Sequence, residues 1–213
     1  MKEPLILFGA GSHAKVVLDA LICAGTPPDF AVDDAPEGDG LFGVRVISSS
    51  DHEWRRYGSF RFALAVGDNQ NRRRIFEELK SKGGVPINVI HPAATVSPRA
   101  KLGLGIVVFA GAVINPDAII GDNCIVNTSA SIDHDCKLGA HAHICPGVHM
   151  AGDVTVGTGA LIGVGTAILP GMTIGDWTTV GAGSVVNRDL PSNAVAFGCP
   201  AKVQRLLPVQ PSA

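Results

Sequence analysis

A run of six-residue units decides the fold: from Ala112 to His141 the chain reads AVINPD AIIGDN CIVNTS ASIDHD CKLGAH. Each unit begins with a small residue and carries Ile, Val or Leu at its third place. The register extends in both directions, and every sixth residue from Ile90 to Val186 is Ile, Leu, Val or Met. A period of six is a multiple of the two-residue strand repeat and fits the 3.6-residue helical turn poorly. The pattern therefore predicts short parallel strands wound into a solenoid, with the aliphatic side chains inside.

A second period of 18 residues lies on top of the first. Glycine recurs at Gly103, Gly121, Gly139, Gly157 and Gly175. Three units therefore make one coil, and we expect these glycines at one corner, where the backbone turns sharply or takes a positive φ. The solenoid should span residues 90–187, slightly more than five coils. The strict hexad resembles the left-handed parallel β-helix of the hexapeptide-repeat acyltransferases, and the left hand is taken from that resemblance.

The composition agrees with a repetitive fold and excludes other classes. The chain has 213 residues, with 26 glycines and 5% aromatic against 46% hydrophobic residues, so small branched side chains must fill the core. A formal net charge of −2 argues against a dedicated nucleic-acid binder, which shows a basic face. No apolar run approaches the roughly 18 residues that a membrane span needs. Five cysteines without a CxxC pair indicate the reducing cytoplasm.

The residues before the repeat alternate between strand and helix patterns. Apolar runs typical of strands cover residues 5–8, 30–32 and 62–66. A glycine turn and a helix follow the first run, and a charged helix over 70–82 follows the third. This alternation predicts a small Rossmann-like parallel α/β domain over residues 1–89. Residues 188–213 follow the solenoid as a C-terminal tail.

Two features of this domain point to a nucleotide. The turn around Gly11 begins a helix, and free backbone N–H groups at a helix start favour a phosphate. Asp33 and Asp34 end the second strand, where carboxylates accept hydrogen bonds from a ribose or a base. The alternative is a tight strand-to-helix turn without a ligand, because Gly-x-Gly-x-x-Ala alone is a weak signal. About 90 residues supply half of the six-stranded NAD-binding fold, which favours a mononucleotide.

The repeat carries a candidate general base. His134 stands between Asp133 and Asp135, and it points outward because Ile132 holds the core position. A histidine beside a carboxylate is the usual general base near neutral pH. The sequence has no Gly-x-Ser-x-Gly motif and no cysteine beside a base, which favours direct acyl transfer over a covalent intermediate. The alternative is a solvated corner histidine.

Three further histidines leave a zinc site open. His141, His143 and His149 follow His134 closely and would bind the metal across coils or across a subunit boundary, as in the hexapeptide-repeat carbonic anhydrases. Their spacing differs from what we expect of those enzymes, so we predict no metal.

Over residues 4–205 the chain resembles the hexapeptide-repeat sugar acetyltransferases with an N-terminal α/β domain, which acetylate nucleotide-linked 4-amino-4,6-dideoxy sugars. Sialic acid O-acetyltransferases look similar at this level. In the first domain the resemblance rests on Phe8-Gly9-Ala10-Gly11-Ser12-His13, Val32-Asp33-Asp34 and Ala65-Val66-Gly67-Asp68-Asn69. In the repeat it rests on Asn127-Thr128-Ser129, Asp133-His134-Asp135-Cys136, Ala151-Gly152 and Phe197-Gly198-Cys199-Pro200-Ala201-Lys202.

The resemblance implies a homotrimer with acetyl-CoA in the groove between neighbouring β-helices. It implies that His134 is the catalytic base and that Asp135 stands where a glutamate is common. The residues it implies for acetyl-CoA are His143, Gly152, Val164 and Ala182. Those it implies for the nucleotide sugar are Ser12, His13, Asp33, Asp34, Gly67 and Asn69, which join Gly11.

The sequence thus predicts a cytoplasmic N-acetyltransferase that moves acetyl from acetyl-CoA to the amine of a UDP- or GDP-linked 4-amino-4,6-dideoxy sugar. His134 would act as general base in a direct transfer. Three alternatives stay open: a sugar O-acetyltransferase, a zinc-dependent β-helix hydratase or hydrolase, and a nucleotide-sugar sensor without activity. Neither a nucleic-acid nor a membrane partner is expected.

Overall fold

The computed structural model describes residues 3–36 and 40–208. The chain divides into two compact units, Met1–Pro92 and Ala93–Ala213, each of which is described by itself. Residues 209–213 of the predicted C-terminal tail lie outside the described residues. Among the described residues, no helix has both the length and the apolar character needed to cross a membrane.

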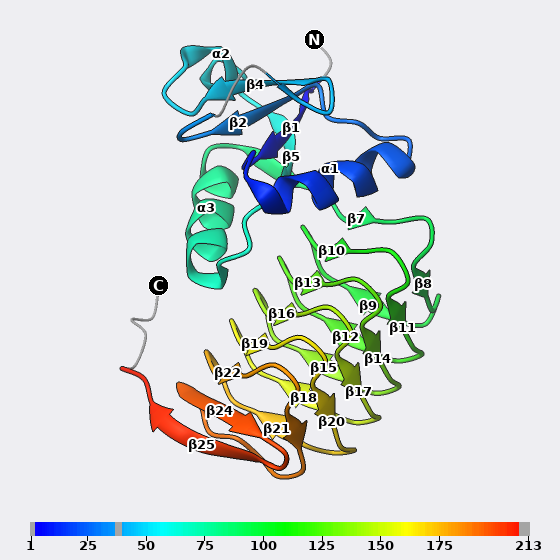
Figure 1. The fold of residues 1–213 in the computed structure, drawn as a ribbon. Coiled ribbons are helices and arrows are strands. Elements are labelled where there is room, and N and C mark those ends of the chain that lie inside the picture. Colours follow the sequence, from blue (N-terminus) through cyan, green and yellow to red (C-terminus); the bar gives the residue numbers. More distant parts are fainter. Residues whose placement is uncertain (1–2, 37–39, 209–213) are drawn as a thin grey trace. The chain divides into compact units, whose positions relative to one another are not determined.

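The first unit is a sheet of six strands in the order β3-β4-β2-β1-β5-β6, parallel except for the β3–β4 pair. Its strands are β1 (Leu5–Phe8), β2 (Phe30–Asp33), β3 (Gly40–Leu41), β4 (Val44–Ser48), β5 (Phe60–Leu64), β6 (Gly84–Pro86) and, outside this sheet, β7 (Val89–Ile90). Its helices are α1 (Ser12–Cys23), α2 (His52–Arg55) and α3 (Asn69–Ser81). The predicted parallel α/β domain is confirmed, although β3, β4, β6 and α2 were not expected (Figure 1).

Most rings of this aromatic-poor chain gather in the core of the first unit. Phe8, Trp54, Phe60, Phe62 and Phe76 are buried in one cluster. Phe8 meets Trp54 edge to face at 5.3 Å between ring centroids, and Phe62 meets Phe76 at 5.9 Å. Such pairs add to the free energy gained by burying the apolar area. The cluster fixes the carboxyl end of β1 next to α2.

The second unit is the predicted parallel solenoid (Figure 1). Its two-residue strands each end on a residue of the aliphatic register, and strands one coil apart pair in parallel, as in Ile114↔Ile132 and Val126↔Ile144. They are β8 (Thr95–Val96), β9 (Lys101–Leu102), β10 (Val107–Val108), β11 (Val113–Ile114), β12 (Ile119–Ile120), β13 (Ile125–Val126), β14 (Ser131–Ile132), β15 (Lys137–Leu138), β16 (His143–Ile144), β17 (His149–Met150), β18 (Thr155–Val156), β19 (Leu161–Ile162), β20 (Ala167–Ile168), β21 (Thr173–Ile174), β22 (Thr179–Val180) and β23 (Val185–Val186).

Three sheets form the faces of this solenoid. One contains β8, β11, β14, β17, β20 and β23, a second contains β9, β12, β15, β18 and β21, and the third runs through β10, β13, β16, β19 and β22. The register residues from Val108 to Val186 are buried. Aliphatic side chains therefore fill the narrow interior, which explains the shortage of rings.

The glycines of the 18-residue repeat have a different cause from positive φ. Gly121, Gly139 and Gly157 are outside the residues with positive φ. A Cβ at Gly121 would come within 2.7 Å of the Ala140 nitrogen, and one at Gly139 within 2.5 Å of the Thr158 nitrogen. Close approach of the next coil therefore demands glycine there. The left-handed backbone falls two residues later, at Asn123 and His141 among others.

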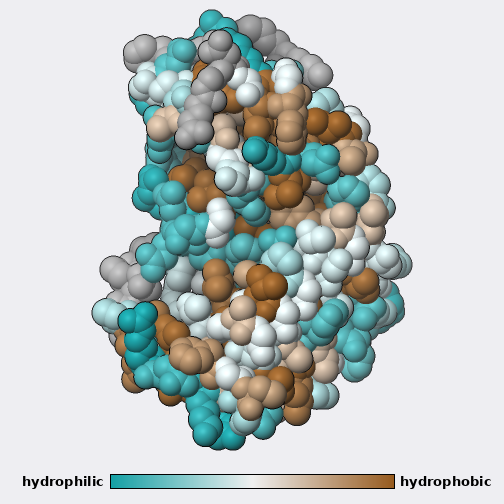
Figure 2. All heavy atoms as spheres, viewed as in Figure 1, coloured by the Kyte–Doolittle hydropathy of each residue, from teal (hydrophilic) through white to brown (hydrophobic). Residues whose placement is uncertain are grey.

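A hairpin follows the last strand of the solenoid, within the C-terminal tail. β24 (Ala194–Gly198) pairs in parallel with β22 and antiparallel with β25 (Ala201–Leu206). Exposed apolar side chains on this unit include Val164, Leu169, Phe197 and Leu206. On the face seen in Figure 2, hydrophobic residues (brown) are interspersed with hydrophilic residues (teal).

Candidate active site

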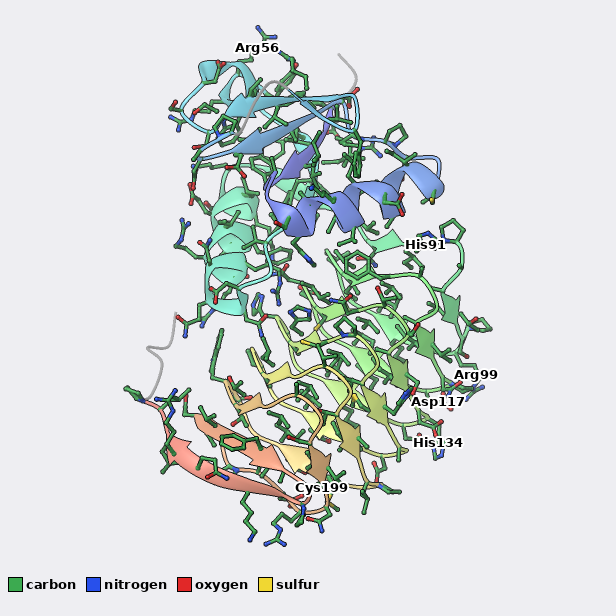
Figure 3. All side chains as sticks on the ribbon, in the orientation of Figure 1. Arg56, His91, Arg99, Asp117, His134 and Cys199 are labelled. Carbon is green, nitrogen blue, oxygen red and sulfur yellow. The ribbon has the colours of Figure 1, made fainter. Side chains whose placement is uncertain are left out.

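His134 lies at a corner of the solenoid, between β14 and β15. Its Nδ1 is 2.8 Å from Oδ2 of Asp135. The side chains of His134 and Asp135 are 62% and 60% exposed. Asp135 has a φ of 62°, a left-handed conformation that Asp adopts more readily than most residues. This conformation brings its carboxylate back to the neighbouring imidazole. Figure 3 shows Arg99, Asp117 and His134 along the same edge of the solenoid.

A second carboxylate fixes the backbone at this corner. Oδ1 of Asp133 accepts the backbone N–H of His134 at 2.8 Å and Nδ2 of Asn115, from the preceding coil, at 3.0 Å. The backbone N–H of Asp153, from the following coil, donates to the His134 carbonyl at 3.0 Å. His134 is therefore held from both neighbouring coils although its ring faces solvent.

The charges around His134 strengthen it as a base. The hydrogen bond to Asp135 raises the pKa of His134 above its ordinary value, and the charges of Asp133, Asp135 and Asp153 act in the same direction. In the neutral ring, a proton on Nδ1 donated to Asp135 leaves the lone pair on Nε2. The arrangement can accept a proton from a substrate at Nε2 and stabilise the resulting imidazolium.

Gly152 lies against this imidazole, one coil further along. A Cβ at position 152 would come within 2.6 Å of Cε1 and 2.7 Å of Nε2 of His134. The resemblance placed Gly152 at acetyl-CoA; the structure places it beside the proposed base. Any side chain there would move the ring.

The other residues expected at acetyl-CoA lie elsewhere on the prism. Val164 and Ala182 occupy the corners after β19 and β22, and Gly183 donates its N–H to the Val164 carbonyl at 2.8 Å. His143, on β16, is buried, with Nε2 3.1 Å from Nδ2 of Asn127. The sheet containing β14, β17 and β20 separates this corner from that of His134. One chain therefore does not bring the two groups together.

The three histidines that the sequence offered as zinc ligands, His141, His143 and His149, do not cluster. Nδ1 of buried His141 is 2.9 Å from Nδ2 of Asn123, and Nδ1 of His149 is 2.8 Å from Oγ of Ser131. His143 meets Asn127 instead. Within the described residues the three rings do not form a group able to share a metal ion. Each contacts a polar residue of the preceding coil.

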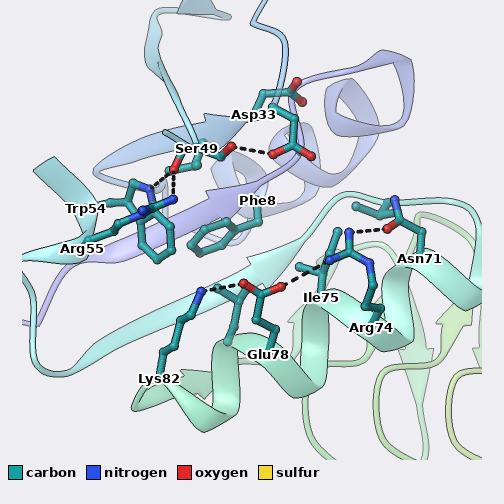
Figure 4. Close-up of a pocket in the computed structure, with 15 residues that line it drawn as sticks. Phe8, Asp33, Ser49, Trp54, Arg55, Asn71, Arg74, Ile75, Glu78 and Lys82 are labelled. Carbon is teal, nitrogen blue, oxygen red and sulfur yellow. Dashed lines mark hydrogen bonds and ion pairs between the residues drawn. The ribbon is translucent and has the colours of Figure 1, made fainter. Parts of the chain in front are cut away.

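A cavity of about 350 Å³ opens in the first unit at the carboxyl ends of β1, β2 and β4 and beside α3 (Figure 4). Asp33 and Asp34 are among the residues that line it. Asp33, however, uses its two oxygens to accept the backbone N–H groups of Ala10 at 2.6 Å and Ala35 at 2.9 Å. Oγ of Ser49 donates to Asp34 at 2.5 Å. Asp33 thus holds the glycine turn in place.

The remaining predicted nucleotide-sugar residues follow β1 and β5. Gly11 and Ser12 are exposed at the start of α1, where no side chain caps the helix. A Cβ on Gly11 or on Gly67 would meet nothing within 4 Å, so the protein itself does not require glycine there. Because β1 and β5 are neighbours from which the chain winds in opposite directions, these residues flank the topological switch point, where α/β sheets bind ligands.

Buried Arg72 holds the loop after β5. Its Nη1 donates to the carbonyls of Val66 at 3.3 Å and Gly67 at 3.1 Å. Burial, and then the charge of Arg72, lower the pKa of His13. His13 is therefore a neutral ring near neutral pH. Asn69, the first residue of α3, is buried.

Several residues that line the cavity are not predicted from the sequence as site residues. They are Phe8, Trp54, Arg55, Arg74, Glu78 and Lys82. Glu78 pairs with Arg74 at 3.2 Å and with Lys82 at 2.5 Å, and Nε1 of Trp54 donates to the Ser49 carbonyl at 3.0 Å. For Arg74, Glu78 and Lys82 the one signal in the sequence was the charged pattern of the helix over 70–82, which is equally typical of a solvated surface.

The α/β unit and the solenoid both occur together in proteins of known structure. The PglD N-terminal domain model matches residues 4–79. PerB from Caulobacter crescentus, crystallised with CoA and GDP-perosamine, is 42% identical over 96% of this chain and 99% of its own, with a TM-score of 0.90. The acetyltransferase domain of PglB from Neisseria gonorrhoeae, crystallised with acetyl coenzyme A, is 37% identical over 95% and 100%, with a TM-score of 0.88.

A curated relative gives a shorter match. The GDP-perosamine N-acetyltransferase of Escherichia coli O157:H7 is 28% identical over 108 residues, which are 48% of this chain and 49% of that protein. The match thus spans about half the length of the curated relative. PerB, by contrast, matches over nearly the whole of both chains. The chain belongs to the hexapeptide-repeat N-acetyltransferases of nucleotide-linked amino sugars.

Proposed function

We propose that this protein transfers the acetyl group of acetyl-CoA to the amine of a nucleotide-linked 4-amino-4,6-dideoxy sugar. The observation that carries the proposal is the His134–Asp135 pair, 2.8 Å apart, at an exposed corner of a solenoid whose 42% identical relative was crystallised with CoA and GDP-perosamine. GDP-linked perosamine is therefore the first substrate to test. A UDP-linked 4-amino sugar is the second.

The chemistry follows from the position of the proton on His134. The sugar amine attacks the thioester carbonyl, and Nε2 of His134 takes the amine proton as the C–N bond forms. Collapse of the tetrahedral intermediate breaks the C–S bond, and the leaving thiolate of CoA takes the proton from the His134 imidazolium, which restores the neutral base. Asp135 stabilises the imidazolium during the step. Holding both substrates beside one base supplies much of the rate.

The first unit would hold the nucleotide of the substrate. The start of α1 at Gly11 and Ser12 offers backbone N–H groups to a diphosphate. A Cβ at Gly11 or Gly67 would meet no protein atom within 4 Å, so a ligand has room to pass close to the backbone at these two positions. Asp34 offers a carboxylate at the edge of the neighbouring cavity.

A homotrimer would complete the acetyl-CoA site. His134 and Gly152 share one corner of the prism, whereas Val164 and Ala182 share another. A cyclic, head-to-tail assembly places unlike surfaces of neighbouring subunits against each other. We infer that the His134 corner of one subunit faces the Val164 corner of the next. All five cysteines are free thiols, which supports a cytoplasmic enzyme.

Thiol release from acetyl-CoA tests the proposed function. The acceptors are the GDP- and UDP-linked 4-amino sugars and, as matched controls, the same nucleotides carrying a 4-hydroxy sugar. We expect CoA release with an amino sugar and an acetamide product in the mass spectrum. Faster acetylation of the hydroxy sugars would instead identify an O-acetyltransferase, and no CoA release with any acceptor would favour a sensor.

A further inference from the structure

The first unit brings together three metal-ligating side chains that the proposed acetyl transfer does not use. One ligand atom each of Asp19, Cys23 and His91, an oxygen, a sulfur and a nitrogen, lie within 4.8 Å of one another. Asp19 and Cys23 are exposed, and His91 is half-buried. We propose that these three side chains bind a zinc ion or a similar borderline divalent cation.

The secondary structure places the three groups side by side. Asp19 and Cys23 lie on α1 (Ser12–Cys23) with four residues from one to the other, a spacing that sets two side chains on one helical face. His91 follows β7 (Val89–Ile90) directly, and α1 contacts β7. Figure 3 labels His91 at this end of the first unit. The end of α1 is itself fixed, because the N–H of Ala24 donates to the Ala20 carbonyl at 3.0 Å and the N–H of Gly25 donates to the Ile22 carbonyl at 2.9 Å.

The donor set selects the kind of metal. Magnesium and calcium prefer oxygen ligands alone, whereas a thiolate and an imidazole are typical zinc ligands. Ligand atoms around a tetrahedral zinc are about 3.3–3.6 Å apart, so the three side chains need to close by roughly one ångström. Asp19 and Cys23 are on the surface and can make this adjustment. With three protein ligands, water would take the fourth coordination position.

Binding would have two consequences for the protein. The ion would cross-link the last turn of α1 to the end of the first unit, and a ligand that binds only the folded state stabilises it. The Cys23 thiol would lose its proton on binding, so affinity for the metal should fall as the pH is lowered. The site would be separate from those proposed for both substrates, because it shares no residue with them.

The test uses the untagged full-length protein, freed of metal with a chelator and titrated with Co²⁺ and then Zn²⁺. We expect one equivalent of metal per chain, a thiolate-to-cobalt charge-transfer band in the near ultraviolet, and displacement of that band by Zn²⁺. Zn²⁺ should also raise the melting temperature of the metal-free protein.

Three variants and one control locate the site. Cys23→Ser should abolish the charge-transfer band, and Asp19→Asn and His91→Gln should each weaken Zn²⁺ binding about tenfold or more. Cys199→Ser, at the other exposed cysteine, should bind as the unmodified protein does. Circular dichroism verifies that each variant is folded. Absence of stoichiometric binding, or unchanged binding in Cys23→Ser and His91→Gln, would overturn the proposal.

Discussion

The imidazole of His134 rests on Gly152 of the next coil, so closely that a Cβ at 152 would come within 2.6 Å of Cε1. His134 is exposed and its ring can swing away, whereas the backbone of Gly152 is buried in the solenoid. A side chain at 152 would therefore displace the base rather than the coil. The imidazole of the proposed base can therefore occupy this position only because residue 152 is glycine.

This contact predicts that Gly152→Ala separates catalysis from stability. Moving the ring by about 1 Å should lower kcat between tenfold and a hundredfold, roughly. The melting temperature should change little, because the ring moves into solvent. Gly58→Ala is the matched control, since a Cβ there meets nothing within 4 Å and Gly58 is outside both proposed sites. An unchanged kcat in Gly152→Ala would mean that the ring position is unimportant.

The acid limb of the pH profile should report the raised pKa of His134. The general base must be neutral, so kcat/KM should fall as the pH drops through this raised pKa. Asp135→Asn removes the largest cause of the shift, and Asn tolerates the left-handed backbone at this position. We expect its acid limb to move to lower pH. Because the amine of the substrate titrates equally with both enzymes, an unmoved limb would show that His134 does not control the profile.

Gly11→Ala should weaken binding of the nucleotide sugar without unfolding the first unit. The new Cβ meets no protein atom, so the free energy of unfolding should fall by no more than about 1 kcal/mol, the cost of alanine at a helix N-cap. A diphosphate lying against the turn would be displaced, and KM for the nucleotide sugar should rise about tenfold. KM for acetyl-CoA serves as the internal control and should stay constant. If the variant and the unmodified protein have the same KM for the nucleotide sugar, Gly11 does not lie at the nucleotide-sugar site.

Mixed trimers test whether each active site is shared between subunits. His134→Asn removes the base at one corner, and Ala182→Trp blocks the other, exposed corner. Each variant alone should be inactive. Coexpressed in equal amounts, they should recover about a quarter of the activity, because that share of the interfaces pairs two intact corners in a cyclic assembly. No recovery would place both corners in a site within one chain.

The solenoid could be predicted closely because its signal repeats. A register residue such as Ile132 recurs every sixth position, and each repetition confirms the period of the last. The cause of the glycines was less accessible: Gly121 and Gly139 are required by the approach of the next coil, which a one-dimensional pattern does not contain. The hairpin of β24 and β25 was missed because it follows the end of the repeat.

The sites were predictable only where their residues are neighbours in sequence. His134 and Asp135 are adjacent, so their pairing could be expected. The contact of His134 with Gly152 crosses one coil, and the contact of Asp33 with the Ala10 amide joins the ends of two strands. The cavity residues of α3 share the polar pattern of any surface helix, and their role depends on the sheet beside them.

The turnover of His134→Asn with acetyl-CoA and the accepted amino sugar tests directly whether His134 is the general base. Asparagine keeps a polar side chain but is not a base in this pH range, and general-base catalysis contributes about a hundredfold or more. We predict that kcat falls by at least about that factor while the Kd of acetyl-CoA, measured calorimetrically, stays near that of the unmodified protein. Near-normal turnover in His134→Asn would show that another group takes the amine proton.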